Sequence, residues 1–182
     1  MSAISTRTVP LTAPDGAILN AYLAVPADTS APVAGVLVAP EWWGLTAYPK
    51  QRAEQLAALG YAALALDVYG DGKTTEQASQ ANDWMMEQLG DQDRLMARAK
   101  TGLDYLANLP EVDANRLAAI GYCFGGKVAL DMAREGLPIK AVASFHGNLT
   151  PKQPATDAFQ AVAIIEHGAA DSLGQPRCDC CI

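Results

Sequence analysis

The sequence has few histidines, few basic residues and no long apolar run. Its 182 residues include 2 histidines, and 13 lysines and arginines stand against 20 acidic residues, for a formal net charge of −7. This negative balance argues against nucleic acid and against an anionic membrane surface as partners. Since no apolar run has transmembrane length and the N-terminus shows no signal-peptide core, we expect a cytoplasmic protein with no membrane partner.

Cysteine is scarce in the body of the chain. Of the 4 cysteines, Cys123 stands alone, and Cys178, Cys180 and Cys181 crowd the end. A disulfide framework needs spaced pairs, and the three terminal thiols are too close together for the usual paired zinc-binding spacing. We therefore expect no metal and no cofactor, and we interpret residues 174–182, which lack helical and strand periodicity, as an aberrant tail.

The apolar pattern predicts an α/β fold with one mostly parallel sheet and helices on both faces. Half of the residues are apolar, which suits one domain with a buried core. Two extended runs around a Pro-Asp-Gly turn predict an N-terminal antiparallel hairpin at a sheet edge. Further strands are predicted at 33–39, 61–66, 116–120, 139–145 and 161–166, and helices at 48–59, 75–109 with a break at 90–91, and 127–135.

Residues 121–126 (Gly-Tyr-Cys-Phe-Gly-Gly) lie between a predicted strand and a predicted helix. Strand, sharp turn and helix with small flanking residues is the setting of a nucleophile elbow. The central Cys123 is then a nucleophile for carbonyl carbon, and the alternative is a buried structural thiol. In such folds the amide after the nucleophile, here Phe124, donates to the oxyanion, and we expect the amide of Trp42, in a loop after an early strand, to be the second donor.

Carboxylates and imidazoles follow other predicted strands. Asp171 is the expected acid that orients a histidine, although it also suits a turn cap, and Glu41 is either a site residue or a solvated loop carboxylate. His146 and His167 lie near the same edge, and we interpret both as structural histidines rather than substitute bases. Because no histidine follows Asp171 in this sequence, we expect the general base to be missing.

Five segments carry a resemblance to the dienelactone hydrolase family of the α/β-hydrolase fold. The resemblance implies a Cys-His-Asp triad that acts on esters or lactones, with Cys123 as nucleophile and Asp171 as acid. It also implies that Glu41 meets the resting thiol and helps to generate the thiolate. The segments are 40–44 (Pro-Glu-Trp-Trp-Gly), 66–72 (Leu-Asp-Val-Tyr-Gly-Asp-Gly), 121–126, 145–147 (Phe-His-Gly) and 167–171 (His-Gly-Ala-Ala-Asp).

Two departures from the family pattern limit this reading. The family's C-terminal histidine has no counterpart, and no arginine in residues 71–80 matches the one that binds substrate carboxylate, where Lys73 is the only cation. We interpret residues 1–173 as an incomplete α/β-hydrolase domain without its last strand and helices, monomeric or self-associating through the exposed sheet edge.

We therefore predict a hydrolase of carboxylic ester or lactone bonds with little turnover. The alternative is a non-catalytic remnant or binding protein that keeps a reactive thiol. Residues 75–90 are a candidate flap beside the site. Four aromatic residues are either the lining of an apolar pocket or ordinary core residues: Trp42, Trp43, Tyr69 and Trp84.

Overall fold

The computed structural model describes residues 3–152 and 159–171, so the expected tail at 174–182 and its three cysteines lie outside the described residues. The strands are β1 (Ile4–Thr12), β2 (Ile18–Pro26), β3 (Val33–Ala39), β4 (Ala62–Ala65), β5 (Val112–Tyr122), β6 (Ala141–Phe145) and β7 (Val162–Glu166). The helices are α1 (Ala47–Ala58), α2 (Ala78–Gly90), α3 (Gln92–Ala107) and α4 (Phe124–Arg134).

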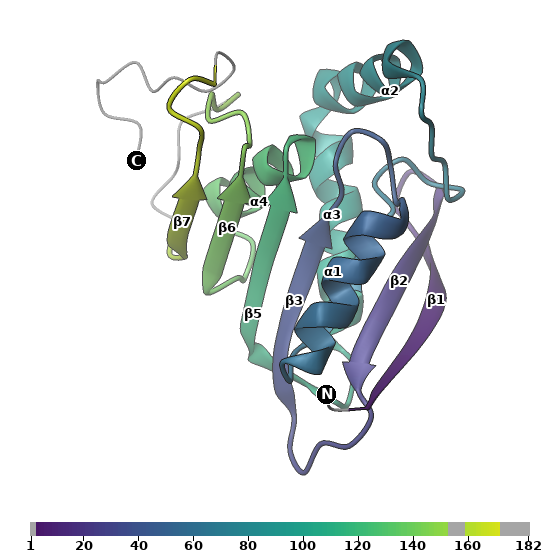
Figure 1. The fold of residues 1–182 in the computed structure, drawn as a ribbon, viewed down its shortest axis with the longest axis vertical. Helices are drawn as coiled ribbons and strands as arrows, with labels where there is room; N and C mark the ends of the chain where they lie inside the picture. Colours follow the sequence, from purple (N-terminus) through teal and green to yellow (C-terminus); the bar gives the residue numbers. More distant parts are fainter. Residues whose placement is uncertain (1–2, 153–158, 172–182) are drawn as a thin grey trace.

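One sheet organises the molecule, in the order β1-β2-β4-β3-β5-β6-β7. The pairings β1–β2 and β2–β4 are antiparallel, and those from β4 through β3, β5 and β6 to β7 are parallel. Helix α1 lies on one face, and α3 and α4 lie on the other (Figure 1). The predicted fold class, with its edge hairpin and its mostly parallel sheet, is confirmed.

The core lies on both faces of the sheet because β3 and β4 carry only apolar residues and glycine. Along β3, Leu37 belongs to the larger cluster, which includes residues of α3 and α4, and Val38 belongs to the smaller one with Ala53 of α1. Fully burying one such aliphatic side chain contributes about 1.5–3 kcal/mol. The two clusters therefore hold β3 and β5 rigidly, and the carboxyl ends of these strands carry the residues discussed below.

Several element boundaries differ from the predictions in an informative way. The predicted helical break is real: Asp91 separates α2 from α3, and its carboxylate accepts the Arg94 amide at 3.0 Å as an N-cap. Strand β5 begins four residues before the predicted start, and the β3–β5 register shifts between Ala34 and Gly35. Helix α4 begins at Phe124 because the first turn includes the two glycines that the sequence pattern assigned to the elbow.

The two edges of the sheet differ in how they are covered. Strand β1 is at one edge and buries Val9 and Leu11. Strand β7 is at the other edge and is exposed at every position, with Val162, Ile164 and Ile165 at 70%, 56% and 46% exposure. Such an open apolar strand is a surface on which other chains can pair. Self-association through this edge stays a prediction.

Candidate active site

Cys123 lies in the turn between β5 and α4 in a strained backbone conformation. Its φ is 55° and its ψ is −117°, a region that a non-glycine residue adopts only when its surroundings impose it. Close packing of α4 imposes it here: a Cβ on Gly125 would lie 2.6 Å from the carbonyl oxygen of Pro40. The first turn of α4 is thereby pressed against the end of β3, and the thiol is raised at the carboxyl edge of the sheet.

The surroundings of the thiol favour its protonated form. Burial is the largest influence and raises the pKa of Cys123, and the negative charges of Glu41 and Asp171 raise it further. A hydrogen bond from the Phe124 amide acts in the opposite direction and lowers this pKa. The structure thus brings Cys123, Phe124, Glu41 and Asp171 together, as the sequence predicts. It also indicates that Glu41, as an anion, holds the thiol protonated.

Tyr69 connects the two segments that are expected to supply oxyanion donors. Its hydroxyl donates to the carbonyl oxygen of Trp42 at 2.9 Å, and its ring stacks on Phe124 with centroids 6.1 Å apart and planes 9° apart. The loop itself is tight, since the Gly44 amide donates to the Glu41 carbonyl at 3.2 Å. Sequence reasoning missed this role and treated Tyr69 only as a pocket or core aromatic. Whether the Trp42 amide is the second donor stays a prediction.

A buried polar network holds Tyr69 in place. Asp67 is fully buried and accepts the amides of Gly70 and Gly72 at 3.0 and 2.7 Å, which fixes the turn after β4. Arg98 of α3 donates to the Tyr69 carbonyl at 3.1 Å and pairs with Asp15 in the turn of the N-terminal hairpin at 2.7 Å. Because these groups are buried and partnered, the loop that holds Tyr69 is as well fixed as a secondary-structure element.

Two imidazoles share the carboxylate of Asp171. Nδ1 of His146 is in direct contact with its Oδ2 atom, and Nε2 of His167 lies 3.4 Å from the same oxygen. The two rings stack with centroids 6.2 Å apart. The side chains of Asp171 and His167 are nearly buried, whereas that of His146 is 56% exposed. His146 reaches the acid from the end of β6, and the expectation that both histidines are structural stays a prediction.

The aromatic residues of the predicted pocket divide between two roles. The rings of Tyr69 and Trp84 have their centroids 5.5 Å apart, and Trp84, on α2, packs against the larger core cluster. The rings of Trp42 and Trp43 are arranged edge to face, with centroids 4.9 Å apart. Trp43 also lines a shallow hollow of about 280 Å³ together with three residues beside the oxyanion loop: Thr46, Thr75 and Glu76.

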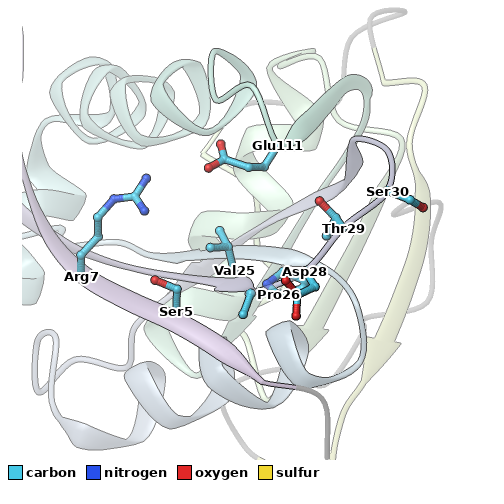
Figure 2. A pocket seen from close by; sticks show the side chains of 9 residues that line it. Ser5, Arg7, Val25, Pro26, Asp28, Thr29, Ser30 and Glu111 are labelled. Carbon is cyan, nitrogen blue, oxygen red and sulfur yellow. The ribbon is translucent and has the colours of Figure 1, made fainter.

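A larger hollow lies far from the thiol. It has a volume of about 730 Å³ and lies at the amino ends of β3 and β5, where Arg7, Asp28 and Glu111 contribute charged side chains (Figure 2). All 11 residues of β5 separate Glu111 from Cys123. No cysteine or histidine lines this hollow, and ligands of parallel sheets bind at the carboxyl ends of the strands. We therefore place the candidate active site at Cys123, not in this hollow.

Two features, a membrane-spanning helix and a metal-binding cluster, are absent from the described ranges. None of the helices there has the length and apolarity that crossing a lipid bilayer requires. Among the same residues, no group of three or more His, Cys, Asp or Glu side chains is arranged to hold a metal ion.

The model of the dienelactone hydrolase family matches residues 19–177. Carboxymethylenebutenolidase 1 of Cupriavidus pinatubonensis is 28% identical over 175 residues, which are 90% of this chain and 71% of that protein. The chain spans only 56% of the length of a curated relative from Methylorubrum extorquens and 37% of the length of one from Caenorhabditis elegans.

Solved structures with similar folds point to the same family. The structure named m3DLH superposes with a TM-score of 0.91 at 38% identity, covering 96% of this chain and 73% of that one. A dienelactone hydrolase-like promiscuous phosphotriesterase from metagenomic libraries has a TM-score of 0.90 at 37% identity, with the same coverage. The match to the family model includes the elbow, the loop at 40–44 and Asp171.

Proposed function

The chain belongs to the dienelactone hydrolase family, and from this premise we propose that it cleaves carboxylic ester or lactone bonds with Cys123 as the nucleophile. One observation carries the proposal. The thiol is held on a strained elbow, beside the Phe124 amide that already hydrogen-bonds to it. A small-molecule ester or lactone is the substrate class, and no cofactor takes part in the steps proposed here.

The reaction begins with attack of the Cys123 sulfur on the carbonyl carbon. The carbonyl oxygen becomes an oxyanion, which the Phe124 amide and, by our prediction, the Trp42 amide stabilise. Collapse of this intermediate breaks the bond to the alcohol and leaves a thioester on Cys123. Water then attacks the thioester and releases the acid. A lost oxyanion donor typically slows such reactions by about 10²–10³-fold, so the position of these amides is decisive.

Glu41 has a definite electrostatic role in this proposal. Its negative charge contributes to the raised pKa of Cys123, so the thiol rests in the protonated form and is protected from oxidation and alkylation. Removing the charge by Glu41→Gln should lower the pKa of Cys123 and make the resting thiol more reactive toward iodoacetamide. The thiolate-generating role that the family resemblance implies would instead have the Glu41 carboxylate take the proton of the thiol and become neutral.

Proton transfer from a protonated thiol also requires a base. In the family pattern the triad histidine follows the acid in the chain. This sequence contains two histidines, His146 and His167, and both precede Asp171.

The function is tested by following the acyl-enzyme. The protein is mixed with p-nitrophenyl acetate, the release of p-nitrophenol is recorded, and the intact mass is measured. We expect an acetyl group on Cys123 and a burst of product in the wild-type protein, and neither in Cys123→Ala. Hydrolysis of a five-membered lactone is measured in parallel, because a thiol acylated by an activated ester alone would support a weaker claim.

The binding-protein alternative gives a different result in the same experiment. A Cys123 that is never acetylated in a folded protein would contradict the hydrolase and favour a non-catalytic protein. Cys178, Cys180 and Cys181 also react with such reagents, so the modified residue is identified by peptide mass analysis.

A further inference from the structure

We propose that the hollow beside the loop at 40–44 is a subsite for a positively charged group of the ester substrate, such as the trimethylammonium group of a choline ester. This inference rests on the proposed function and names the class of substrate that the site prefers. The hollow has a volume of about 280 Å³. A water molecule occupies about 30 Å³ in the liquid, so the hollow has room for a group of several non-hydrogen atoms. Four residues line it: Trp43, Thr46, Thr75 and Glu76.

The two segments that form the walls of this hollow are hydrogen-bonded to each other. Gly44 and Thr74 form an antiparallel bridge, and the Thr75 amide donates to the Trp43 carbonyl at 3.2 Å. The two backbones are in close contact, since a Cβ on Gly44 would overlap the carbonyl group of Lys73. Paired main chain on both sides therefore fixes the shape of the hollow, and a preformed subsite loses little entropy when it binds a ligand.

The hollow adjoins the part of the loop that acts on the thiol. The ring of Trp43 packs edge to face against the ring of Trp42, whose amide is the predicted second oxyanion donor. Trp43 follows Glu41 by two residues, a span of at most about 7 Å of backbone. Glu41 is near enough for its negative charge to act on Cys123. A ligand in the hollow therefore lies beside the loop that is expected to receive the substrate's carbonyl oxygen.

The chemistry of the lining favours a cation. The indole ring of Trp43 attracts a positive group through its quadrupole, and the carboxylate of Glu76 attracts it through its charge. Glu76 is exposed and takes part in no ion pair among the described residues, so its charge is available to a ligand. The other two lining side chains are neutral threonines. An aromatic ring beside an available carboxylate is a suitable environment for a quaternary ammonium group.

The charges that act on the thiol have the same sign as Glu76. Glu41 and Asp171 both affect Cys123 as negative charges. A substrate with a carboxylate would approach three negative side chains, whereas a cationic substrate is attracted by all of them. We therefore expect the order of preference to be cationic, then neutral, then anionic esters.

The cations Lys73 and Arg52, in the neighbouring segments, have partners of their own. Nζ of Lys73 lies 3.7 Å from the carboxylate of Asp71, so this pair adds no net charge. Arg52 of α1 donates to the Tyr48 hydroxyl at 2.9 Å and to the side-chain oxygen of Gln55 at 2.7 Å. Neither cation lines the hollow, so neither offsets the charge of Glu76 there.

The first experiment measures binding without catalysis. Choline and its neutral isostere 3,3-dimethylbutanol are titrated into Cys123→Ala, and binding is followed by nuclear magnetic resonance. We expect choline to bind about 5-fold more tightly than the neutral alcohol. Adding Glu76→Gln should bring the two affinities close together. Asp83→Asn, which removes one exposed negative charge from α2, is the matched control and should keep the preference.

The second experiment measures the preference in the reaction. Acetylation of Cys123 is compared for acetylcholine, 3,3-dimethylbutyl acetate and the acetate ester of 3-hydroxypropanesulfonate, which have similar size and differ in charge. We expect kcat/KM to fall in that order, by about 5-fold between the first two esters. Glu76→Gln should lower the ratio of the first to the second, and Asp83→Asn should not.

Three outcomes would overturn the inference. The first is that Cys123→Ala binds choline no more tightly than the neutral alcohol. The second is a folded Glu76→Gln variant that keeps the full preference for the cation. The third is an equal loss of preference in Asp83→Asn, which would mean that net charge and not the hollow attracts the ligand. If none of the esters acetylates Cys123, the proposed function fails, whereas the binding experiment still decides whether the hollow takes a cation.

Discussion

The proposed nucleophile and the proposed acid, Cys123 and Asp171, are held in place in opposite ways. Cys123 is held by backbone packing: the turn is pressed between β3 and α4, and a single added carbon at Gly125 would overlap main-chain atoms. Asp171 is held by side chains from β6 and from the loop after β7, next to the most exposed strand of the sheet. The candidate site is therefore rigid at the thiol and adaptable around the carboxylate.

This contrast explains why one half of the site is more tolerant of substitution than the other. A change at the elbow must move main chain in three elements at once. A change around the carboxylate needs only new side-chain rotamers, because His146 is more than half exposed. The following predictions test that contrast, beginning with the largest expected effect.

Replacing Gly125 with alanine should unfold or severely destabilise the protein. The new Cβ would meet the carbonyl groups of Ala39 and Pro40, which cannot move without separating β3 from α4. We expect a loss of about 3 kcal/mol or more in the free energy of unfolding, measured by urea titration, and loss of acetylation of Cys123. Gly90→Ala is the control, since its Cβ meets nothing within 4 Å and should change stability by less than about 1 kcal/mol. Equal stabilities of the two variants would contradict the rigid elbow.

Replacing Asp171 with asparagine should reduce ester hydrolysis by roughly 10³-fold while the fold is retained. The substitution has two separate consequences, one for the turnover and one for the pKa of Cys123. Loss of the carboxylate removes the partner of His146, and loss of its charge lowers the pKa of Cys123, which the negative charge of Asp171 raises. Alkylation at alkaline pH should therefore begin at a lower pH than in the wild type, although turnover falls. Asp83→Asn, an exposed change on α2, should leave both measurements unchanged.

Removing the hydroxyl of Tyr69 should slow acetylation about 10-fold without slowing alkylation. Tyr69→Phe keeps the ring on Phe124 but loses the hydrogen bond to the Trp42 carbonyl, so the oxyanion loop loses one support. Iodoacetamide forms no oxyanion, and its rate should stay at the wild-type value. Tyr61→Phe, at a half-exposed tyrosine, is the control. A parallel drop in both rates would indicate general damage to the elbow rather than a role in positioning donors.

The smallest expected effect is a loss of stability in alkali. Burial is the chief cause that raises the pKa of both Cys123 and Tyr69 above their ordinary values of 9.0 and 10.0. Both groups lose a favourable proton on ionisation, so the stabilisation is present below pH 9.0–10.0 and is lost as the pH rises through the raised values. Urea unfolding at pH 8 and pH 11 should show that Tyr69→Phe reduces this loss by about 1 kcal/mol. Tyr61→Phe should keep the full loss.

The elbow could be predicted from the sequence alone because the residues that determine its conformation are adjacent in the chain. Glycines around Cys123, an apolar strand before it and a helix after it dictate one backbone path. Asp171 was placed correctly for a related reason, since it follows a strand whose direction is set by the parallel sheet. The contacts among Cys123, Glu41 and Asp171 are consistent with that reasoning, and their catalytic roles stay predictions until they are tested.

The contacts of His146 and Tyr69 could not be predicted in the same way. The contact of His146 with Asp171 depends on the register of β6 against β7, two strands that a long connection separates. The bond from Tyr69 to Trp42 depends on how the turn after β4 folds back over the oxyanion loop. Neither side chain belongs to a local pattern, and both positions suit ordinary structural residues. Side-chain direction across distant elements was the missing information.

The buried Arg98 has a consequence for anyone who shortens or redesigns this protein. Its guanidinium joins Asp15, in the turn between β1 and β2, to the main-chain carbonyls of Val68 and Tyr69. An N-terminal trimming that removes β1 and this turn would leave a buried cation with half of its partners gone. The hairpin at the far edge of the sheet therefore supports the turn that carries Tyr69. Tags or fusions are best attached without disturbing this hairpin.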